Sequence, residues 1–169
     1  MRDVDVFLLV AAGGAWMDLS QGRIDNGFVL CSLMAGFLCR LVRYGPESLP
    51  ASLAGAVLPL LLLGWLFALR VLGAGDIKLL MALGSFLGPG PCLDCLWGSL
   101  ICGAALSLLM LCRSGELVSR MSHALGYLGG CLKTGTIVPY RPLESPGEGT
   151  IPFALAILGG AIYAAGGLC

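Results

Sequence analysis

The chain has 169 residues, of which 57% are apolar or aromatic and only 12% are charged, about half the charged share of a typical soluble domain. Ten Lys and Arg balance ten Asp and Glu, so there is no basic excess to meet phosphates, and no nucleic-acid partner is expected. The apolar content also excludes a disordered chain. The composition therefore predicts an all-α, polytopic integral membrane protein whose surroundings are a lipid bilayer.

Long apolar runs mark the expected membrane-spanning helices, each of which needs about 20 residues. The runs are too long and too continuously apolar for barrel strands. About six transmembrane helices are expected, at Val4–Met17, Gly27–Val42, Ala51–Leu72, Ile77–Leu87, Leu93–Cys112 and Ile151–Leu168. The fourth run has the weakest signal, because it is short and ends at a Gly-Pro pair. Residues 1–169 are expected to form a single membrane-embedded domain.

One long polar segment, at about residues 113–150, interrupts the apolar pattern. Apolar residues in its first half recur every three or four positions, which predicts an amphipathic helix lying on the cytoplasmic surface. The stretch Thr134–Gly149 is rich in Pro and Gly and reads as a loop. That loop is either part of a substrate groove or a surface linker.

The Lys and Arg residues give an orientation. With six spans, alternate loops share a side, and seven basic residues fall on one side against three on the other. The larger set is Arg23, Arg70, Lys78, Arg113, Arg120, Lys133 and Arg141, and the smaller set is Arg2, Arg40 and Arg43. The larger set is placed in the cytoplasm by the positive-inside rule.

Two acidic residues lie at the ends of apolar runs, where solvation by bulk water does not explain their presence. Asp18 ends the first apolar run, and Asp76 lies in the short connection between the third and fourth runs. By topology, both carboxylates reach one level on the cytoplasmic side. Ionisable groups at membrane depth are costly, so a functional role is the default hypothesis.

Two carboxylates at one level are suited to acid–base chemistry. Like-charge repulsion leaves such a pair with one shared proton, so that one acid activates water and the other protonates a peptide carbonyl. Gly73 and Gly75 flank Asp76 and are expected to allow positive φ and close backbone approach. This is the arrangement of an aspartic protease, and it needs no metal or other cofactor.

These residues carry a resemblance. Gly73–Asp76 is a G-x-G-D motif, Asp18–Asn26 resembles the D-L…R-x-I-P-N stretch of type IV prepilin peptidases, and Gly149–Ala154 is similar to that family's G-x-I-P-F-G/A segment. The three matches fall in the family's order and cover most of the chain. One departure is Asp25, which stands where the family usually has Pro and adds a third acid near the site.

The resemblance implies a membrane aspartic endopeptidase that cleaves the leader peptide of prepilin-like precursors at the cytoplasmic face of the inner membrane. Asp18 and Asp76 would be the catalytic pair. Larger members carry an insertion with paired C-x-x-C motifs, which goes with zinc and N-methylation. This chain has no room for that insertion between Asn26 and Cys31, so it looks like the short, peptidase-only form.

Other motif residues are expected to support the site or the substrate. They are Gly73, Gly75, Lys78, Arg23, Asn26, Pro152 and Phe153. Lys78 is interpreted as an interfacial anchor rather than a partner of Asp76, because side chains two apart on a helix point away from each other. Pro152 suits the first turn of the last span, and Phe153 is most simply a packing residue.

The cysteines do not favour a metal site. Cys92 and Cys95 form the only C-x-x-C, and no second pair or His lies nearby to complete four zinc ligands. On the expected topology this pair faces outward, where a disulfide is possible. His123, the only His, is interpreted as an interfacial helix residue.

Other function classes remain open at this point. A transporter or channel subunit would use Asp18 and Asp76 as ion or proton ligands. Another G-x-G-D protease that cuts within transmembrane segments, or a catalytically silent scaffold for pilus assembly, would keep part of the pattern. The Asp18 stretch together with Ile151–Phe153 favours the prepilin type.

Overall fold

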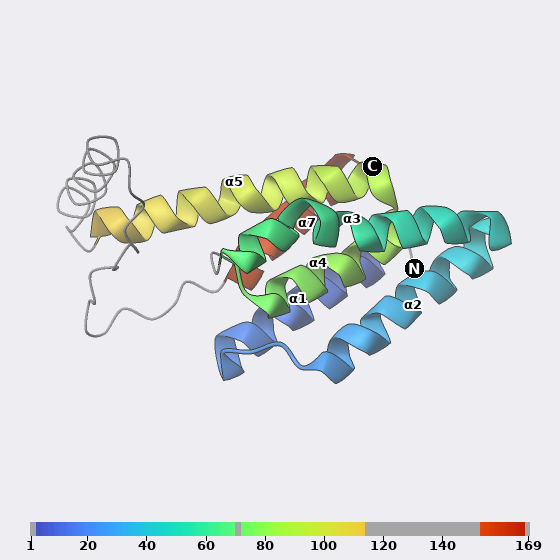
Figure 1. Ribbon diagram of the computed structural model, residues 1–169, viewed down its shortest axis with the longest axis horizontal. Helices are drawn as coiled ribbons and strands as arrows, with labels where there is room; N and C mark the ends of the chain where they lie inside the picture. The colour runs from blue at the N-terminus through green and yellow to red at the C-terminus, as the bar shows by residue number, and fades with distance from the viewer. Residues whose placement is uncertain (1–2, 70–71, 114–152, 168–169) are drawn as a thin grey trace. The chain divides into compact units, whose positions relative to one another are not determined.

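The computed structural model describes residues 3–69, 72–113 and 153–167, and these form six α-helices and no strand (Figure 1). The helices are α1 (Asp3–Gln21), α2 (Asn26–Tyr44), α3 (Leu49–Ala68), α4 (Ala74–Leu87), α5 (Pro89–Arg113) and α7 (Phe153–Gly167). A single 3-10 turn, Pro46–Ser48, leads into α3. The all-α prediction is confirmed. The expected surface helix and loop between 113 and 150 lie, apart from Arg113, outside the described residues.

The chain divides into two compact units. Residues 1–104 and 152–169 form the first, which contains both acids of interest, and residues 105–151 form the second. Of the second unit, residues 105–113 are described, as the end of α5. The expectation of a single domain over residues 1–169 stays a prediction.

The six helices match the six expected spans, with shifted ends. α1 continues to Gln21, so Asp18 lies in its last turn rather than beyond it. α5 begins at Pro89, because Pro is well tolerated in the first turn of a helix. Three glycines with positive φ, Gly22, Gly45 and Gly88, follow the ends of α1, α2 and α4, where the chain takes a backbone conformation that glycine adopts more readily than other residues.

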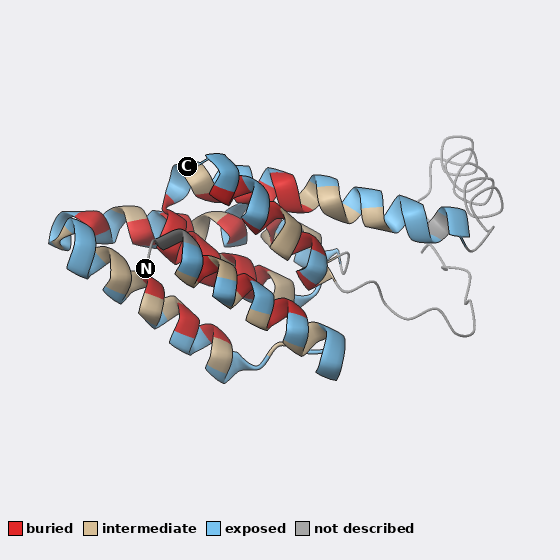
Figure 2. Cartoon of the chain, turned by 180° about the vertical axis from the view of Figure 1, so that it is seen from behind, coloured by how far each residue is buried: buried red, intermediate tan, exposed pale blue. Residues whose placement is uncertain are grey.

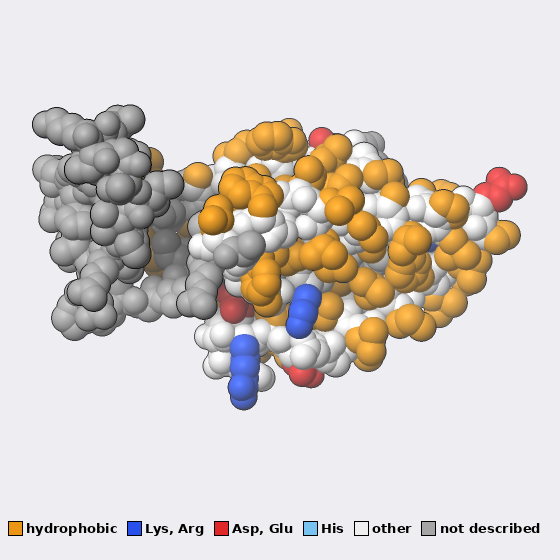
Figure 3. Space-filling view, in the orientation of Figure 1, with side chains coloured by type: hydrophobic (Ala, Val, Ile, Leu, Met, Phe, Trp, Pro, Cys, Tyr) orange, Lys and Arg blue, Asp and Glu red, His pale blue; other side chains and the backbone are white. Residues whose placement is uncertain are grey.

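Several helices have the length and composition to cross a membrane. Three candidates lie within the described residues, at Asn26–Tyr44, Pro46–Phe67 and Pro89–Met110, and α7 is a shorter apolar helix. Large apolar side chains such as Val42 and Leu61 are about three-quarters exposed (76% and 75%). Figure 2 shows that exposed residues lie along the outward faces of the helices. Figure 3, which shows the opposite face from Figure 2, has an apolar surface with few charges over the described residues. Such a surface identifies a membrane protein.

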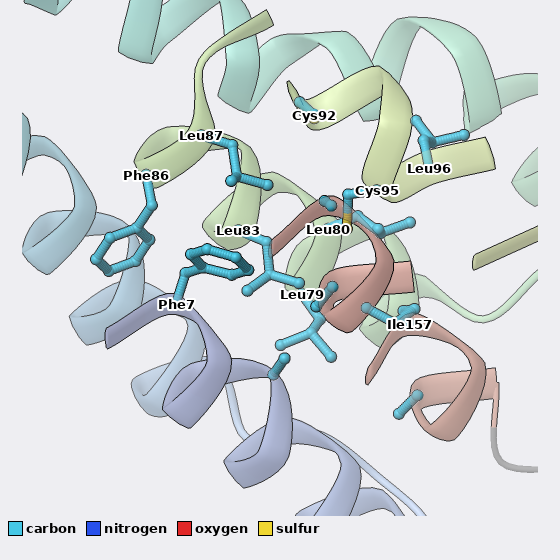
Figure 4. Close-up of a cluster of buried hydrophobic side chains, with 14 of the residues drawn as sticks. Phe7, Leu79, Leu80, Leu83, Phe86, Leu87, Cys92, Cys95, Leu96 and Ile157 are labelled. Atoms are coloured by element: carbon cyan, nitrogen blue, oxygen red, sulfur yellow. The ribbon is translucent and has the colours of Figure 1, made fainter. Parts of the chain in front are cut away.

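The short helix α4 occupies the centre of the first unit. Its 14 residues span only about 21 Å, less than the roughly 30 Å hydrocarbon core of a bilayer. It packs against α1, α2, α3 and α7, and every residue from Leu79 to Leu87 except Met81 is buried. Figure 4 shows Leu83 and Phe86 of α4 beside Phe7 of α1 in this core. Because neighbouring helices surround α4, it does not need to match the membrane thickness.

Glycines allow the neighbours of α4 to approach closely. A methyl group placed on Gly14 of α1 would lie 2.6 Å from Leu79 Cδ1, and Gly55 of α3 lies against the backbone of Gly84. The contacts also give the helix directions. Asn26 pairs with Lys78 and Leu33 with Ser85, so α2 runs parallel to α4. This places the starts of α2 and α4 at the same end of the unit.

Candidate active site

Asp18 lies in the last turn of α1, on the inner side of that helix. The buried residues Phe7, Ala11 and Ala15 recur every four positions, and Asp18 continues this stripe one turn later, partly buried. The chain turns away directly afterwards, with the Gly22 N–H donating to the Asp18 carbonyl at 2.9 Å. A carboxylate at the C-terminal end of a helix meets the negative end of the macrodipole. Asp18 is therefore poorly placed for stabilising its own helix.

Asp76 lies in the first turn of α4, ahead of the apolar run that begins at Ile77. Its carboxylate accepts a hydrogen bond from the backbone N–H of Gly73, the residue that precedes the helix. This is one half of a capping box, in which the third helical residue reaches back to the N-cap. A methyl group on Gly73 would lie 3.0 Å from Asp76 Oδ2. The first glycine of the motif thus leaves room for the carboxylate to fold back.

The two acids are electrostatically coupled. Burial of the side chain and, as a smaller cause, the nearby Asp18 carboxylate raise the pKa of Asp76 from 3.8 to about 6. The hydrogen bond from Gly73 acts in the opposite direction. Gly14, one turn before Asp18 on α1, contacts Leu79, one turn after Asp76 on α4. The helices α1 and α4 are therefore antiparallel, and the end of α1 that carries Asp18 lies at the end of α4 that carries Asp76. The level that topology predicts for both carboxylates agrees with this arrangement.

The two motif glycines do not adopt the positive φ that glycine permits. Gly73 has φ −72° and ψ 145°, and Gly75 lies inside α4, so neither is among the glycines with positive φ. The reason is that α4 begins at Ala74, which gives Gly73 the extended backbone of an ordinary N-cap. Gly73 instead provides space for Asp76. Gly75 faces Ile24, and a methyl group there would lie at an ordinary 3.6 Å from Ile24 Cβ.

The connection between α1 and α2 packs on the G-x-G-D turn. Ile24 is half-buried against Gly75, and the Lys78 Nζ donates a hydrogen bond of 2.8 Å to Asn26 Oδ1. The side chains of Lys78 and Asn26 are exposed. Two motifs that lie about 50 residues apart in the sequence are therefore joined at the acidic end of α4.

The remaining motif residues do not join this cluster of contacts. Arg23 is exposed on the connection, and Phe153 begins α7, where its ring packs against Gly103 of α5. That contact agrees with the packing role expected for Phe153. Pro152 lies outside the described residues.

Cys92 and Cys95 are buried with free thiols in the first turns of α5. The Cys92 thiol lies 3.5 Å from the carbonyl oxygen of Gly55, so Cys92 contributes to packing between α3 and α5. Within the described ranges no group of three or more His, Cys, Asp or Glu side chains is placed to hold a metal ion. His123 lies outside these ranges.

Sequence reasoning missed two features of the site. It did not pair Lys78 with Asn26, and it gave no role to Ile24. A usable signal was present, since Asn26 and Lys78 are polar residues at the starts of two spans that enter the membrane from the same expected side. Sequence spacing alone does not show that these two spans are neighbours.

The arrangement provides two acids, one of which keeps its proton to an unusually high pH. Such a pair supplies a general base and a general acid within one site. Comparison with known proteins gives an independent result. The sequence model of the type IV leader peptidase family matches residues 6–108, a range that contains both acids, Gly73 and Gly75. No curated protein and no solved structure matches the chain.

Proposed function

The chain belongs to the type IV leader peptidase family, and from this premise we propose that it is an aspartic endopeptidase that removes the leader peptide of prepilin-like precursors, with Asp18 and Asp76 as the catalytic pair. The observation that carries the proposal is the coupling of these two acids at the ends of antiparallel helices. The family match supports a protease. The pair supplies a hydrolytic mechanism that uses water and no metal.

The mechanism assigns different roles to the two acids. Burial and, as a smaller cause, the nearby Asp18 raise the pKa of Asp76 to about 6, so Asp76 is assigned as the acid that, in its protonated form, donates a hydrogen bond to the carbonyl oxygen of the scissile peptide. Ionised Asp18 takes a proton from water, whose oxygen bonds to the carbonyl carbon as Asp76 protonates the carbonyl oxygen. In the second step the C–N bond breaks, the leaving nitrogen takes the proton held by Asp18, and Asp76 recovers its own proton from the tetrahedral intermediate. The titration belongs to the pair, which shares one proton.

The proposed function requires a particular orientation of the protein in the membrane. We place the protein in the inner membrane as a multi-pass protein, with the acidic end of α4 facing the cytoplasm. The uneven distribution of Lys and Arg supports this orientation. Ser20, which is exposed in the last turn of α1, and Glu47, which is exposed before α3, are chosen to report on the two sides of the membrane. In a chain with its native cysteines replaced, Glu47→Cys should react with an impermeant maleimide in intact cells, and Ser20→Cys only after permeabilisation; the reverse pattern would refute the orientation.

The catalytic proposal is tested with purified protein in detergent and a synthetic precursor that carries a basic leader, a glycine before the cleavage point and an apolar stem. Asp18→Asn and Asp76→Asn should each lower the cleavage rate by about 10²–10⁴-fold, the usual contribution of a general acid or base. Asp94→Asn, an exposed acid on α5, is the matched control and should cleave normally. Full activity in either catalytic variant would refute the pair. Cleavage inside the apolar stem would point to the other G-x-G-D type of protease.

A further inference from the structure

Lys78 has a specific partner in the structure. Its ammonium lies 2.8 Å from the side-chain oxygen of Asn26, which is a hydrogen bond of ordinary charge-assisted length. Lys78 follows Asp76 by two positions on α4, so the two side chains point in different directions. The hydrogen bond to Asn26 is therefore the contact by which Lys78 can hold neighbouring segments in place.

Asn26 links this bond to the chain segment that follows Asp18. It is the first residue of α2, and only the residues from Gly22 to Asp25 separate it from the end of α1. In that connection Ile24 packs against Gly75, one residue before Asp76. The hydrogen bond and the apolar contact together hold the connection against the first turn of α4, from two adjacent points.

Helix electrostatics do not explain the position of Lys78. The N-terminus of a helix carries partial positive charge, so a cation beside the first residue of α2 is unfavourable for that helix. An anchor that only reaches toward lipid headgroups also needs no fixed neutral partner. The short contact with Asn26 therefore indicates a role in holding the two segments together.

We propose that Lys78 and Asn26 are positioning residues: their hydrogen bond holds the α1–α2 connection on the G-x-G-D turn and so keeps Asp18 within electrostatic reach of Asp76. This inference rests on the proposed peptidase function, which it deepens. Neither residue contacts the reacting atoms. Their contribution is to the geometry in which one acid activates water and the other holds the carbonyl.

The kinetic test uses Asn26→Ala, Lys78→Met and the double variant, with Lys78→Arg as the conservative replacement. Each single variant should lower kcat about five- to tenfold and leave KM within about twofold, because a charge-assisted hydrogen bond is lost. The double variant should be no slower than the slower single variant, since both remove the same bond. Lys78→Arg should recover most of the rate. Arg43→Met removes a cation at the opposite end of α2 and should keep normal kcat.

A second readout does not depend on cleavage. Carbodiimide labels protonated carboxyl groups, so the pH dependence of Asp76 labelling, followed by mass spectrometry, reports its protonation. Among charged groups, the Asp18 carboxylate on α1 raises the pKa of Asp76. The adjoining segments also carry Arg23 and Asp25 on the connection and Lys78 on α4. Asn26→Ala changes none of these charges. A downward shift of the labelling midpoint in that variant would therefore show that Asp76 has moved away from Asp18 or toward solvent.

The outcomes distinguish a failure of the proposed peptidase function from a failure of the positioning role of Lys78 and Asn26. If the wild-type protein cleaves no precursor, the proposed function fails, while the labelling midpoint still tests the Lys78–Asn26 bond. An unchanged midpoint in Asn26→Ala, additive losses in the double variant, or an equal loss of kcat in Arg43→Met would each overturn the positioning role. A rise in KM with unchanged kcat would also overturn it, in favour of direct substrate contact.

Discussion

At its last turn α4 receives a cation from α2, whereas at its first turn it faces an acid from α1. Arg40 donates from Nη1 to the carbonyl oxygen of Phe86 at 3.2 Å, and its guanidinium lies 5.5 Å from the centre of the Tyr44 ring. A cation there offsets the partial negative charge at the end of a helix. At the first turn, Asp76 is half-buried beside Asp18, and the two like charges oppose each other.

The difference separates an end of the helix whose contacts stabilise the fold from an end that carries the proposed catalytic pair. The Arg40 contact explains why a basic residue stands on the side with few positive charges: it satisfies a helix end rather than orienting the chain. The Asp18–Asp76 pair lowers stability, because burial and like charge both disfavour the ionised forms. An arrangement that costs folding free energy is typical of a functional site.

The largest loss of stability is expected when the contact of Arg40 with the last turn of α4 is removed. Arg40→Met should lower the free energy of unfolding by about 1.5 kcal/mol, the lower end for a hydrogen bond to a charged group. The lower end applies because the buried Arg40 Nε has no hydrogen-bond partner among the described residues. Thermal unfolding in detergent measures the loss, and the cleavage rate per folded molecule should not change. Arg40→Lys keeps the charge and should recover part of the stability; a loss of kcat in Arg40→Met would remove the contrast between the two ends.

A gain in stability, rather than a loss, is expected from a substitution at the first turn of α4. The folded protein holds a proton on Asp76 up to about pH 6, whereas the unfolded chain releases it near 3.8, so this group lowers stability progressively as the pH rises from about 4 to 6. Asp76→Asn removes that cost and should raise the melting temperature by a few degrees at pH 7, with the gain disappearing below about pH 4. Asp94→Asn serves as the control. A variant that is inactive and also less stable at pH 7 would contradict this account.

The smallest expected effects are those of alanine substitutions at the two motif glycines, which should differ in their loss of kcat. Gly73→Ala places a methyl group 3.0 Å from the Asp76 carboxylate and should lower kcat about tenfold, equivalent to about 1.4 kcal/mol. Gly75→Ala meets Ile24 at an ordinary distance and should lower kcat less than threefold, while the helix gains about 0.5–1 kcal/mol of stability. Parallel cleavage and unfolding measurements compare the two. Equal loss of activity would mean that the space beside the carboxylate is not what Gly73 provides.

The fold was largely predictable, because about 20 consecutive apolar residues leave a helix as the simplest way to satisfy the backbone in lipid. The level of Asp18 and Asp76 was also predictable, since alternating spans return the chain to the same side. What could not be predicted depends on which helices are neighbours. The bonds from Lys78 to Asn26 and from Arg40 to Phe86 join residues 52 and 46 positions apart, respectively. The extended backbone of Gly73 likewise depends on where α4 begins.

The central claim is that Asp18 and Asp76 form one coupled pair, and the most direct measurement compares the pH at which Asp76 takes up its proton in the wild type and in Asp18→Asn. Carbodiimide labelling of Asp76 should have its midpoint near pH 6 in the wild type. In Asp18→Asn the midpoint should fall toward 3.8 without reaching it, because burial is the larger cause of the raised pKa and remains. A midpoint that is the same in both proteins would show that the two acids do not act as a pair, and would contradict the account.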